Sequence, residues 1–146
     1  MLTGYIKHPK VKRCVSFADV KDDANESLLV EDDLLARRNI ASYLRRSQLE
    51  VDEAADGEEA VRLITSIDAY DVVVSDLRMP GMTDGMDVIA CQQRVSPGTG
   101  SILVTAFGSD QLQKKAQALG IVYLEKPLSL TVLVAQINDL ITTRSP

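Results

Sequence analysis

Four short apolar runs of the sequence are each followed by polar side chains that could do chemistry. The runs are "LLV" (28–30), "VVV" (72–74), "ILV" (102–104) and "IVYL" (121–124), and the polar residues that follow them are Glu31, Asp32, Asp33, Asp76, Thr105 and Lys126. Taken singly, each has an ordinary role: Asp33 is expected to cap a helix, and Asp76 suits a turn. Their shared position at the ends of apolar runs favours one common site.

Carboxylates gathered in one place would need a proton or a cation among them. Two carboxylates about 4 Å apart repel by roughly 4 kcal/mol at an effective dielectric constant of 20, so a cluster of three is costly without such a partner. Oxygen ligands alone suit Mg²⁺, with Mn²⁺ as the alternative, better than zinc, which prefers nitrogen and sulfur. The only histidine, His8, lies near the N-terminus. The sequence therefore predicts a partly hydrated magnesium site.

An aspartate beside a cation, a lysine and a hydroxyl could accept a phosphoryl group. Carboxylates are known covalent nucleophiles for this chemistry, and the reaction needs mainly positioning and charge neutralisation. Lys126 and Mg²⁺ would offset the charge of the transferred group, and Thr105 would donate a hydrogen bond to one of its oxygens. Asp76 is the candidate acceptor.

The elements that must position these residues alternate along the chain. The four apolar runs and the alternating segment "LEVDEA" (49–54) are strand-like. Four helices are predicted from apolar residues at helical spacing, namely Leu34, Ile40, Ala41 and Leu44; Ala60, Val61, Ile64 and Ile67; Leu112, Ala116 and Leu119; and Leu130, Leu133, Val134, Ile137 and Ile141. A fifth, at about 85–94, is the least periodic and precedes the loop "SPGTG" (96–100). Gly120 is expected to end its helix in a left-handed conformation.

Five strand–helix units predict an α/β fold. The strands would form a five-stranded parallel sheet with helices on both faces, and right-handed crossovers make such a sheet doubly wound. Ligands bind outside the carboxyl ends of the strands in these sheets, which is the edge where the polar residues emerge.

Composition and charge exclude several classes of protein. The chain has 146 residues, is 45% apolar and carries a net charge of −5, which suits one globular domain and gives no basic footprint for nucleic acid. No apolar run approaches the roughly 20 residues of a membrane helix, and no secretory pattern opens the chain. Cys14 and Cys91 are too few for a disulfide framework. We expect a cytoplasmic protein.

The domain boundaries follow from the periodicity. Residues 1–25 are expected to be an N-terminal tail with a short extended piece at Cys14–Ala18, and the basic residues within it are read as solvated. Residues 26–142 form the predicted domain. Residues 143–146 are the C-terminal end or the remnant of a linker.

Four separated motifs give the chain a family resemblance. "LLVEDD", "SDLRMPG", "LVTA" and "YLEKP", together with the order of the strands and helices, resemble the receiver domain of two-component response regulators. The resemblance covers about residues 26–142. It implies a flavodoxin-like sheet with strand order 2-1-3-4-5. "TAFGS" also resembles receivers of nitrogen-type enhancer-binding regulators.

The resemblance implies roles for particular residues. Asp76 matches the phosphorylated aspartate, and Glu31 and Asp32 match the acidic pair that holds Mg²⁺, completed by the backbone carbonyl of Arg78. Thr105 and Lys126 match the switch hydroxyl and the phosphate-pairing lysine. Tyr123 stands at the position of the family's switch aromatic.

The resemblance also implies partners. Family members take a phosphoryl group from a histidine kinase or a phosphotransfer protein, catalyse their own phosphotransfer and dephosphorylation, and change the face formed by the fourth helix, fifth strand and fifth helix. That face would control a downstream protein or output domain, and it is compatible with a homodimer formed on phosphorylation.

Two departures from the family pattern stand near the site. "MPGMTDGMDV" carries one extra residue between Met82 and Gly85, which is expected to alter the loop beside Asp76. Arg78 and Phe107 occupy the two variable flanking positions. A long cation and a bulky ring there are expected to shield a phosphoryl group from water and to slow self-dephosphorylation.

Other functions are open at this point. A metal-dependent phosphatase also uses an aspartyl nucleophile, but such enzymes place a second acid where this chain has Arg78. A receiver-like interaction module would work without phosphorylation. The chain could also be the excised input domain of a transcription factor or hybrid kinase.

Overall fold

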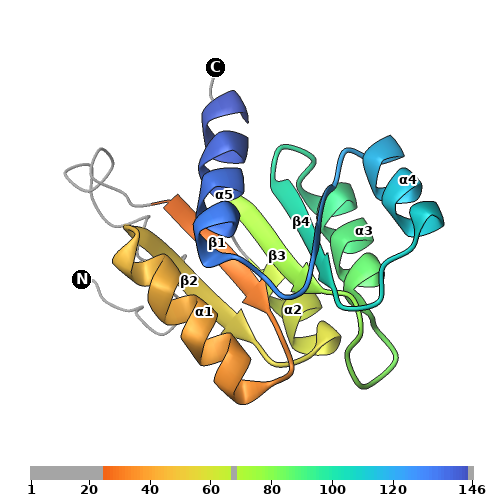
Figure 1. The fold of residues 1–146 in the computed structure, drawn as a ribbon, viewed down its shortest axis with the longest axis horizontal. Helices are drawn as coiled ribbons and strands as arrows, with labels where there is room; N and C mark the ends of the chain where they lie inside the picture. The colour runs from red at the N-terminus through yellow and green to blue at the C-terminus, as the bar shows by residue number, and fades with distance from the viewer. Residues whose placement is uncertain (1–24, 67–68, 145–146) are drawn as a thin grey trace.

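A computed structural model describes residues 25–66 and 69–144 of the chain. In this part, strands and helices alternate along the sequence (Figure 1): β1 (Asn25–Val30), α1 (Leu34–Arg46), β2 (Leu49–Ala54), α2 (Gly57–Ile64), β3 (Val72–Asp76), α3 (Gly85–Val95), β4 (Gly100–Thr105), α4 (Asp110–Ala118), β5 (Val122–Glu125) and α5 (Leu130–Arg144). All ten predicted elements are therefore confirmed. The predicted extended piece at Cys14–Ala18, and Ile67, lie outside the described residues.

The five strands form one parallel sheet in the order β2-β1-β3-β4-β5, as predicted. Its register brings the carboxyl ends of the central strands together. Val30 pairs with Ser75, Asp76 pairs with Val104, and Thr105 pairs with Glu125. The residues that directly follow β1 and β5, and the last residues of β3 and β4, therefore share one edge of the sheet.

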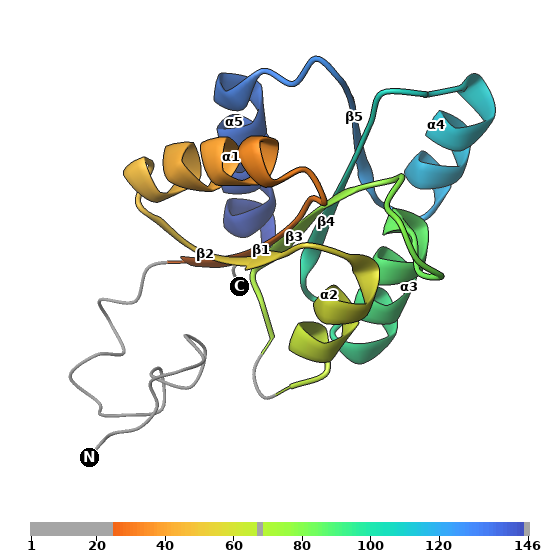
Figure 2. The ribbon, with the colours of Figure 1, turned by 90° about the horizontal axis from the view of Figure 1, so that it is seen from below.

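Helices cover both faces of the sheet (Figure 2). α1 and α5 pack on one face through buried residues that include Leu44, Leu133 and Ile137. α2 and α3 cover the other face, where Ile64 and Val88 are buried. α4 extends this second layer beside β5. Because the central strands are buried on both sides, they read in the sequence as continuous apolar runs.

Side-chain caps fix where several helices begin. Asp33 accepts hydrogen bonds from the backbone N–H groups of Leu35 and Ala36 at the start of α1, which confirms its predicted role. Asp84 and Asp87 form a reciprocal capping box at the start of α3. This cap explains how the weakly periodic helix α3 begins beside the site, although its apolar spacing gives little signal.

Two of the apolar residues that indicated helical spacing are exposed in the structure. Leu34 is 48% exposed, because it opens α1 only four residues after the end of β1 and so lies at the edge of the sheet rather than over it. Leu119 is 46% exposed and caps α4 instead of belonging to it. Gly120 follows with a φ of 74°, which confirms the predicted left-handed end.

Two further predictions can be compared with the described residues. Cys91 is a buried free thiol in α3, whereas Cys14 lies outside the described range. Within residues 25–66 and 69–144, no helix is both long and apolar enough to cross a membrane.

Candidate functional site: an acidic cluster at the carboxyl edge of the sheet

Three carboxylates meet at the edge where β1 and β3 end. Glu31 and Asp32 follow β1, Asp76 is the last residue of β3, and each offers an oxygen within 4.8 Å of the others. Glu31 and Asp76 are buried, with relative exposures of 4% and 9%, whereas Asp32 is exposed. The fold therefore brings these three acids together, as predicted.

Lys126 reaches into this cluster from the segment between β5 and α5. Its Nζ lies 3.3 Å from Glu31 Oε1 and 3.3 Å from Asp76 Oδ1, so that one ammonium bridges two buried carboxylates. The backbone of Lys126 is held by a hydrogen bond from its N–H to the carbonyl of Thr105 at 2.9 Å. The peptide bond that follows it, to Pro127, is cis.

The electrostatics of the cluster follow from burial and crowding. Burial raises the pKa of the Asp76 carboxyl, the neighbouring Glu31 raises this pKa further, and Lys126 opposes both effects. Burial by itself lowers the pKa of the Lys126 ammonium, but the nearby charges of Asp76 and Glu31 outweigh it and raise this pKa above its usual value. The site thus carries more negative charge than its single lysine neutralises.

The donor set fits a small divalent cation of the Mg²⁺ type. Its atoms are carboxylate oxygens, which are the ligands that such cations prefer. Burial, and then the charge of Glu31, raise the pKa of Asp76, and a cation beside its carboxylate would favour the ionised form. The exposure of Asp32 leaves one side of the cluster open to the water molecules that Mg²⁺ usually retains. Glu31, Asp32 and Asp76 could therefore hold the cation.

Thr105 is the last residue of β4, which neighbours β3, and Tyr123 lies on β5, the strand beyond it. Thr105 is 1% exposed, and its Oγ1 accepts a hydrogen bond from the N–H of Phe107 at 3.0 Å. Tyr123 is half-buried beside Leu103, its partner in register, and its hydroxyl donates to Glu125 Oε2 at 3.0 Å. Thr105 therefore lies at the edge of the site. The Tyr123 hydroxyl is instead bonded to Glu125 on its own strand.

Arg78 and Phe107, each two residues beyond a residue of the site along the chain, contact each other. The guanidinium carbon of Arg78 lies 4.8 Å from the centre of the Phe107 ring, within the range of a cation–π interaction. Both side chains are exposed. The contact joins the loop after β3 to the loop after β4, and sequence reasoning had predicted the two flanking positions but not their stacking.

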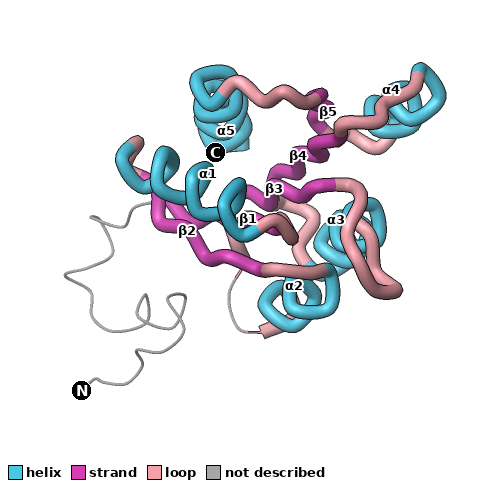
Figure 3. The backbone as a smooth tube through the Cα atoms, turned by 60° about the horizontal axis from the view of Figure 1, so that its bottom comes forward, coloured by secondary structure: helices cyan, strands magenta, loops and turns pink. Residues whose placement is uncertain are grey.

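The loop from β3 to α3 is held against α2. The N–H of Met82 donates to Glu58 Oε2 at 3.2 Å, and Thr83 packs so closely on Gly57 that a side chain there would collide with it. Figure 3 shows this loop, in pink, beside α2 and α3. The segment with the predicted extra residue is thus anchored at the start of α2, a contact that the sequence did not reveal.

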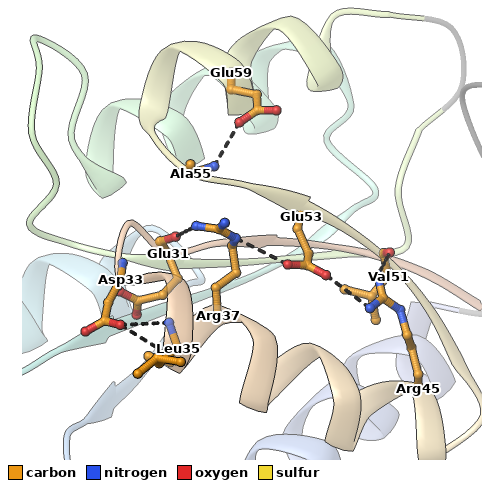
Figure 4. Close-up of polar contacts among 10 residues, drawn as sticks. Glu31, Asp33, Leu35, Arg37, Arg45, Val51, Glu53, Ala55 and Glu59 are labelled. Atoms are coloured by element: carbon orange, nitrogen blue, oxygen red, sulfur yellow. Dashed lines mark hydrogen bonds and ion pairs between the residues drawn. The ribbon is translucent and has the colours of Figure 1, made fainter.

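Sequence reasoning also missed a network of arginines behind Glu31. Arg37 in α1 donates to the carbonyl oxygen of Glu31 and to the side chain of Glu53, and Arg45 donates to Glu53 and to the carbonyl of Val51 (Figure 4). The available signal was the spacing of the arginines within α1, which places both on the side that faces β2.

The chain is similar to bacterial transcriptional regulatory proteins. The transcriptional regulatory protein PdtaR of Mycobacterium tuberculosis is 36% identical over 115 residues, which is 76% of this chain and 54% of the relative. The transcriptional regulatory protein ResD of Bacillus subtilis is 35% identical over 129 residues, which is 85% of this chain and 52% of the relative. This chain therefore spans about half the length of these curated relatives.

Solved structures share the fold. The receiver domain of the Francisella response regulator 1452 superposes with a TM-score of 0.75 at 27% identity, covering 83% of this chain and 99% of that one. The family model of the response regulator receiver domain matches residues 28–138, which include the acidic cluster and Lys126. The chain belongs to the response regulator receiver domain family of two-component signalling.

Proposed function

We propose that this domain is a signalling switch that accepts a phosphoryl group on Asp76 with the help of Mg²⁺. The observation that carries the proposal is the cluster itself: three carboxylates lie within 4.8 Å of one another, and Lys126 bridges two of them. Receiver domains interact with histidine kinases and output domains. We infer that the phosphoryl donor here is a histidine kinase or a phosphotransfer protein, acting in the cytoplasm.

The transfer step is a displacement at phosphorus. A carboxylate oxygen of Asp76 forms a bond to phosphorus while the bond between phosphorus and the histidine nitrogen of the donor breaks, and the released nitrogen takes up a proton. Bound Mg²⁺ would neutralise charge on the transferred group and orient it. Glu31, Asp32, Asp76 and the carbonyl of Arg78 are the proposed protein ligands. The Lys126 ammonium would pair with a phosphoryl oxygen.

The proposed switch begins at Thr105. Its hydroxyl oxygen now accepts the hydrogen bond from Phe107, and a phosphoryl oxygen on Asp76 would draw the hydroxyl group toward itself. Tyr123 would then exchange its bond to Glu125 for a more buried position. Phosphorylation would bias two pre-existing packings of the α4-β5-α5 face, where an output partner, or a second copy of the chain in a homodimer, would bind.

The chain could act as the input domain of a longer protein. Its coverage of only about half of the curated relatives supports this reading, and it is compatible with the phosphorylation switch. A module that works without phosphorylation would not need Lys126 between Glu31 and Asp76 at 3.3 Å from each. The crowded site therefore favours the switch.

The proposal is tested by phosphorylation with a small donor. After incubation with acetyl phosphate and Mg²⁺, the intact mass of the protein should rise by one phosphoryl group, and the adduct should be lost in alkali, as acyl phosphates are. With EDTA in place of Mg²⁺ the adduct should be absent. If neither acetyl phosphate nor phosphoramidate gives an adduct and the protein does not bind Mg²⁺, the proposed switch is wrong. An interaction module that works without phosphorylation is then the better hypothesis.

The contact between Arg78 and Phe107 predicts a long-lived phosphoryl group. Replacing both by serine should speed loss of the acyl phosphate about fivefold, since a cation–π contact at an exposed site contributes about 1 kcal/mol, and each single replacement should have most of this effect. Decay is followed by intact mass in excess EDTA. Leu119→Ser, another exposed apolar side chain, is the control. Equal lifetimes in wild type, both single variants and the double variant would end the shielding hypothesis.

A further inference from the structure

Arg37 is a largely buried cation that contacts the main chain of a proposed metal ligand. Its Nη1 donates to the carbonyl oxygen of Glu31 at 2.9 Å, and its Nε donates to Glu53 Oε1 at 3.2 Å (Figure 4). Only 14% of the Arg37 side chain is exposed. A planar guanidinium that bonds two partners at once fixes their geometry more firmly than a lysine could.

The carbonyl that Arg37 holds belongs to the peptide between Glu31 and Asp32. The atoms of a peptide unit lie in one plane, from the Cα of one residue to the Cα of the next. A hydrogen bond to this carbonyl oxygen therefore restrains the orientation of both acidic residues. The opposite side of Glu31 is also fixed, because its N–H donates to the carbonyl of Ala54 at 3.1 Å.

The side chain of Glu31 is restrained as well. Its Oε2 accepts a hydrogen bond from the N–H of Asp33 at 3.0 Å, and its Oε1 faces Lys126. Ligands held by such outer contacts lose less freedom when they bind a cation, and removing the outer partner typically weakens metal affinity by about 10- to 100-fold. Lys126 contacts the carboxylate of Glu31, whereas Arg37 contacts its main-chain carbonyl.

We propose that Arg37 is a positioning residue for the cation site, holding the Glu31–Asp32 peptide so that both carboxylates face Asp76. The inference rests on the proposed function, since it takes these acids to be the Mg²⁺ ligands. Glu53 contributes by fixing Arg37, which ties the end of β1 to β2.

Electrostatics alone predicts the opposite effect of removing Arg37. Arg37 is positively charged and lies beside a site for a cation, so loss of its charge by itself should strengthen Mg²⁺ binding. Loss of positioning should weaken it. The direction of the change therefore separates the two roles without any need to know their absolute sizes.

The matched control is Arg45. This arginine also bonds Glu53, at 3.0 Å, and also donates to a backbone carbonyl, that of Val51, at 2.7 Å, but it has no contact with Glu31 among the described interactions. Arg45→Met removes the same charge and an equivalent pair of bonds from the same helix. Arg37→Lys retains the charge but lacks the planar guanidinium that bonds Glu31 and Glu53 at once.

The first measurement is the Mg²⁺ dissociation constant, by calorimetric titration of the metal-free full chain. The second is the NMR chemical shifts of the backbone amides of residues 31–33 in EDTA. Arg37→Met and Arg37→Lys should each bind Mg²⁺ about tenfold more weakly than wild type, with shifted amides even without metal, while Arg45→Met stays within about twofold. Arg37→Lys keeps the test usable if Arg37→Met does not fold.

Three outcomes would overturn the proposal. Unchanged or tighter binding by both Arg37 variants would mean that the residue acts only through its charge or its packing. An equal loss in Arg45→Met would assign the effect to Glu53 or to general stability. If wild type itself binds no Mg²⁺, the proposed cation site fails first and the role of Arg37 fails with it, a result distinct from a wild type that binds and variants that bind equally.

Discussion

Asp76→Asn is expected to take up no phosphoryl group and to be more stable than wild type in metal-free buffer. The amide cannot act as the nucleophile, so incubation with acetyl phosphate should leave its mass unchanged. It also removes a buried charge that Glu31 repels. We expect a gain of about 1 kcal/mol in the free energy of unfolding, because the repulsion by Glu31 and the attraction by Lys126, each roughly 4 kcal/mol at 4 Å, nearly cancel and the cost of burial remains.

The pH dependence of this gain has a definite sign. The pKa of Asp76 in the folded protein lies above its ordinary value of 3.8. Below that ordinary value the carboxyl is protonated in both states and costs nothing. As pH rises from this ordinary value toward the folded pKa, the unfolded state ionises while the buried carboxyl stays protonated, so the stability advantage of Asp76→Asn should grow over this range and level off above the folded pKa.

Thermal melting in EDTA at a series of pH values measures this difference. Asp139→Asn, on the exposed side of α5, serves as the control for loss of an acidic charge. Identical melting temperatures of wild type and Asp76→Asn at neutral pH would show that the carboxylates are not crowded enough to matter.

Lys126→Met should have the largest effect on stability among single changes at the site. It leaves Glu31 and Asp76 buried without the ammonium that now lies 3.3 Å from each. Breaking a fully buried ion pair costs about 3–5 kcal/mol, and since Lys126 is 32% exposed we expect about 2 kcal/mol in EDTA. Phosphoryl uptake should also fall sharply.

Mg²⁺ should restore more stability to Lys126→Met than it adds to wild type, because the cation can replace the missing counter-charge. Urea unfolding with EDTA and with Mg²⁺ measures both quantities. Lys115→Met, on the exposed side of α4, is the control. If Lys126→Met lowers the free energy of unfolding no more than Lys115→Met does, Lys126 has no role in holding the carboxylates together.

The fold and most of the site could be predicted because both depend on the order of elements. Continuous apolar runs such as 72–74 identify buried parallel strands, and the carboxyl ends of such strands meet at one edge. Asp76 and Lys126 could therefore be assigned to one place before any distance was known. The resemblance added the strand order, which periodicity alone does not determine.

What could not be predicted depends on side-chain direction and loop path. The stacking of Arg78 on Phe107 joins two loops whose course no periodic pattern describes. The bonds of Arg37 to Glu31 and Glu53 depend on which way a long side chain leaves α1. The exposure of Leu34 could not be predicted either, because its spacing matches the buried residues of α1 but the helix begins at the edge of the sheet.

The most direct measurement of the central claim is the position of the phosphoryl group. Protein phosphorylated with acetyl phosphate in Mg²⁺ is reduced with borohydride, which converts an aspartyl phosphate to homoserine, and its peptides are sequenced by mass spectrometry. We predict homoserine at residue 76 alone, and none when EDTA replaces Mg²⁺. Homoserine at a different acidic residue, or labelling of Asp76 that is equally strong in EDTA, would contradict a cation-assisted transfer to this carboxylate.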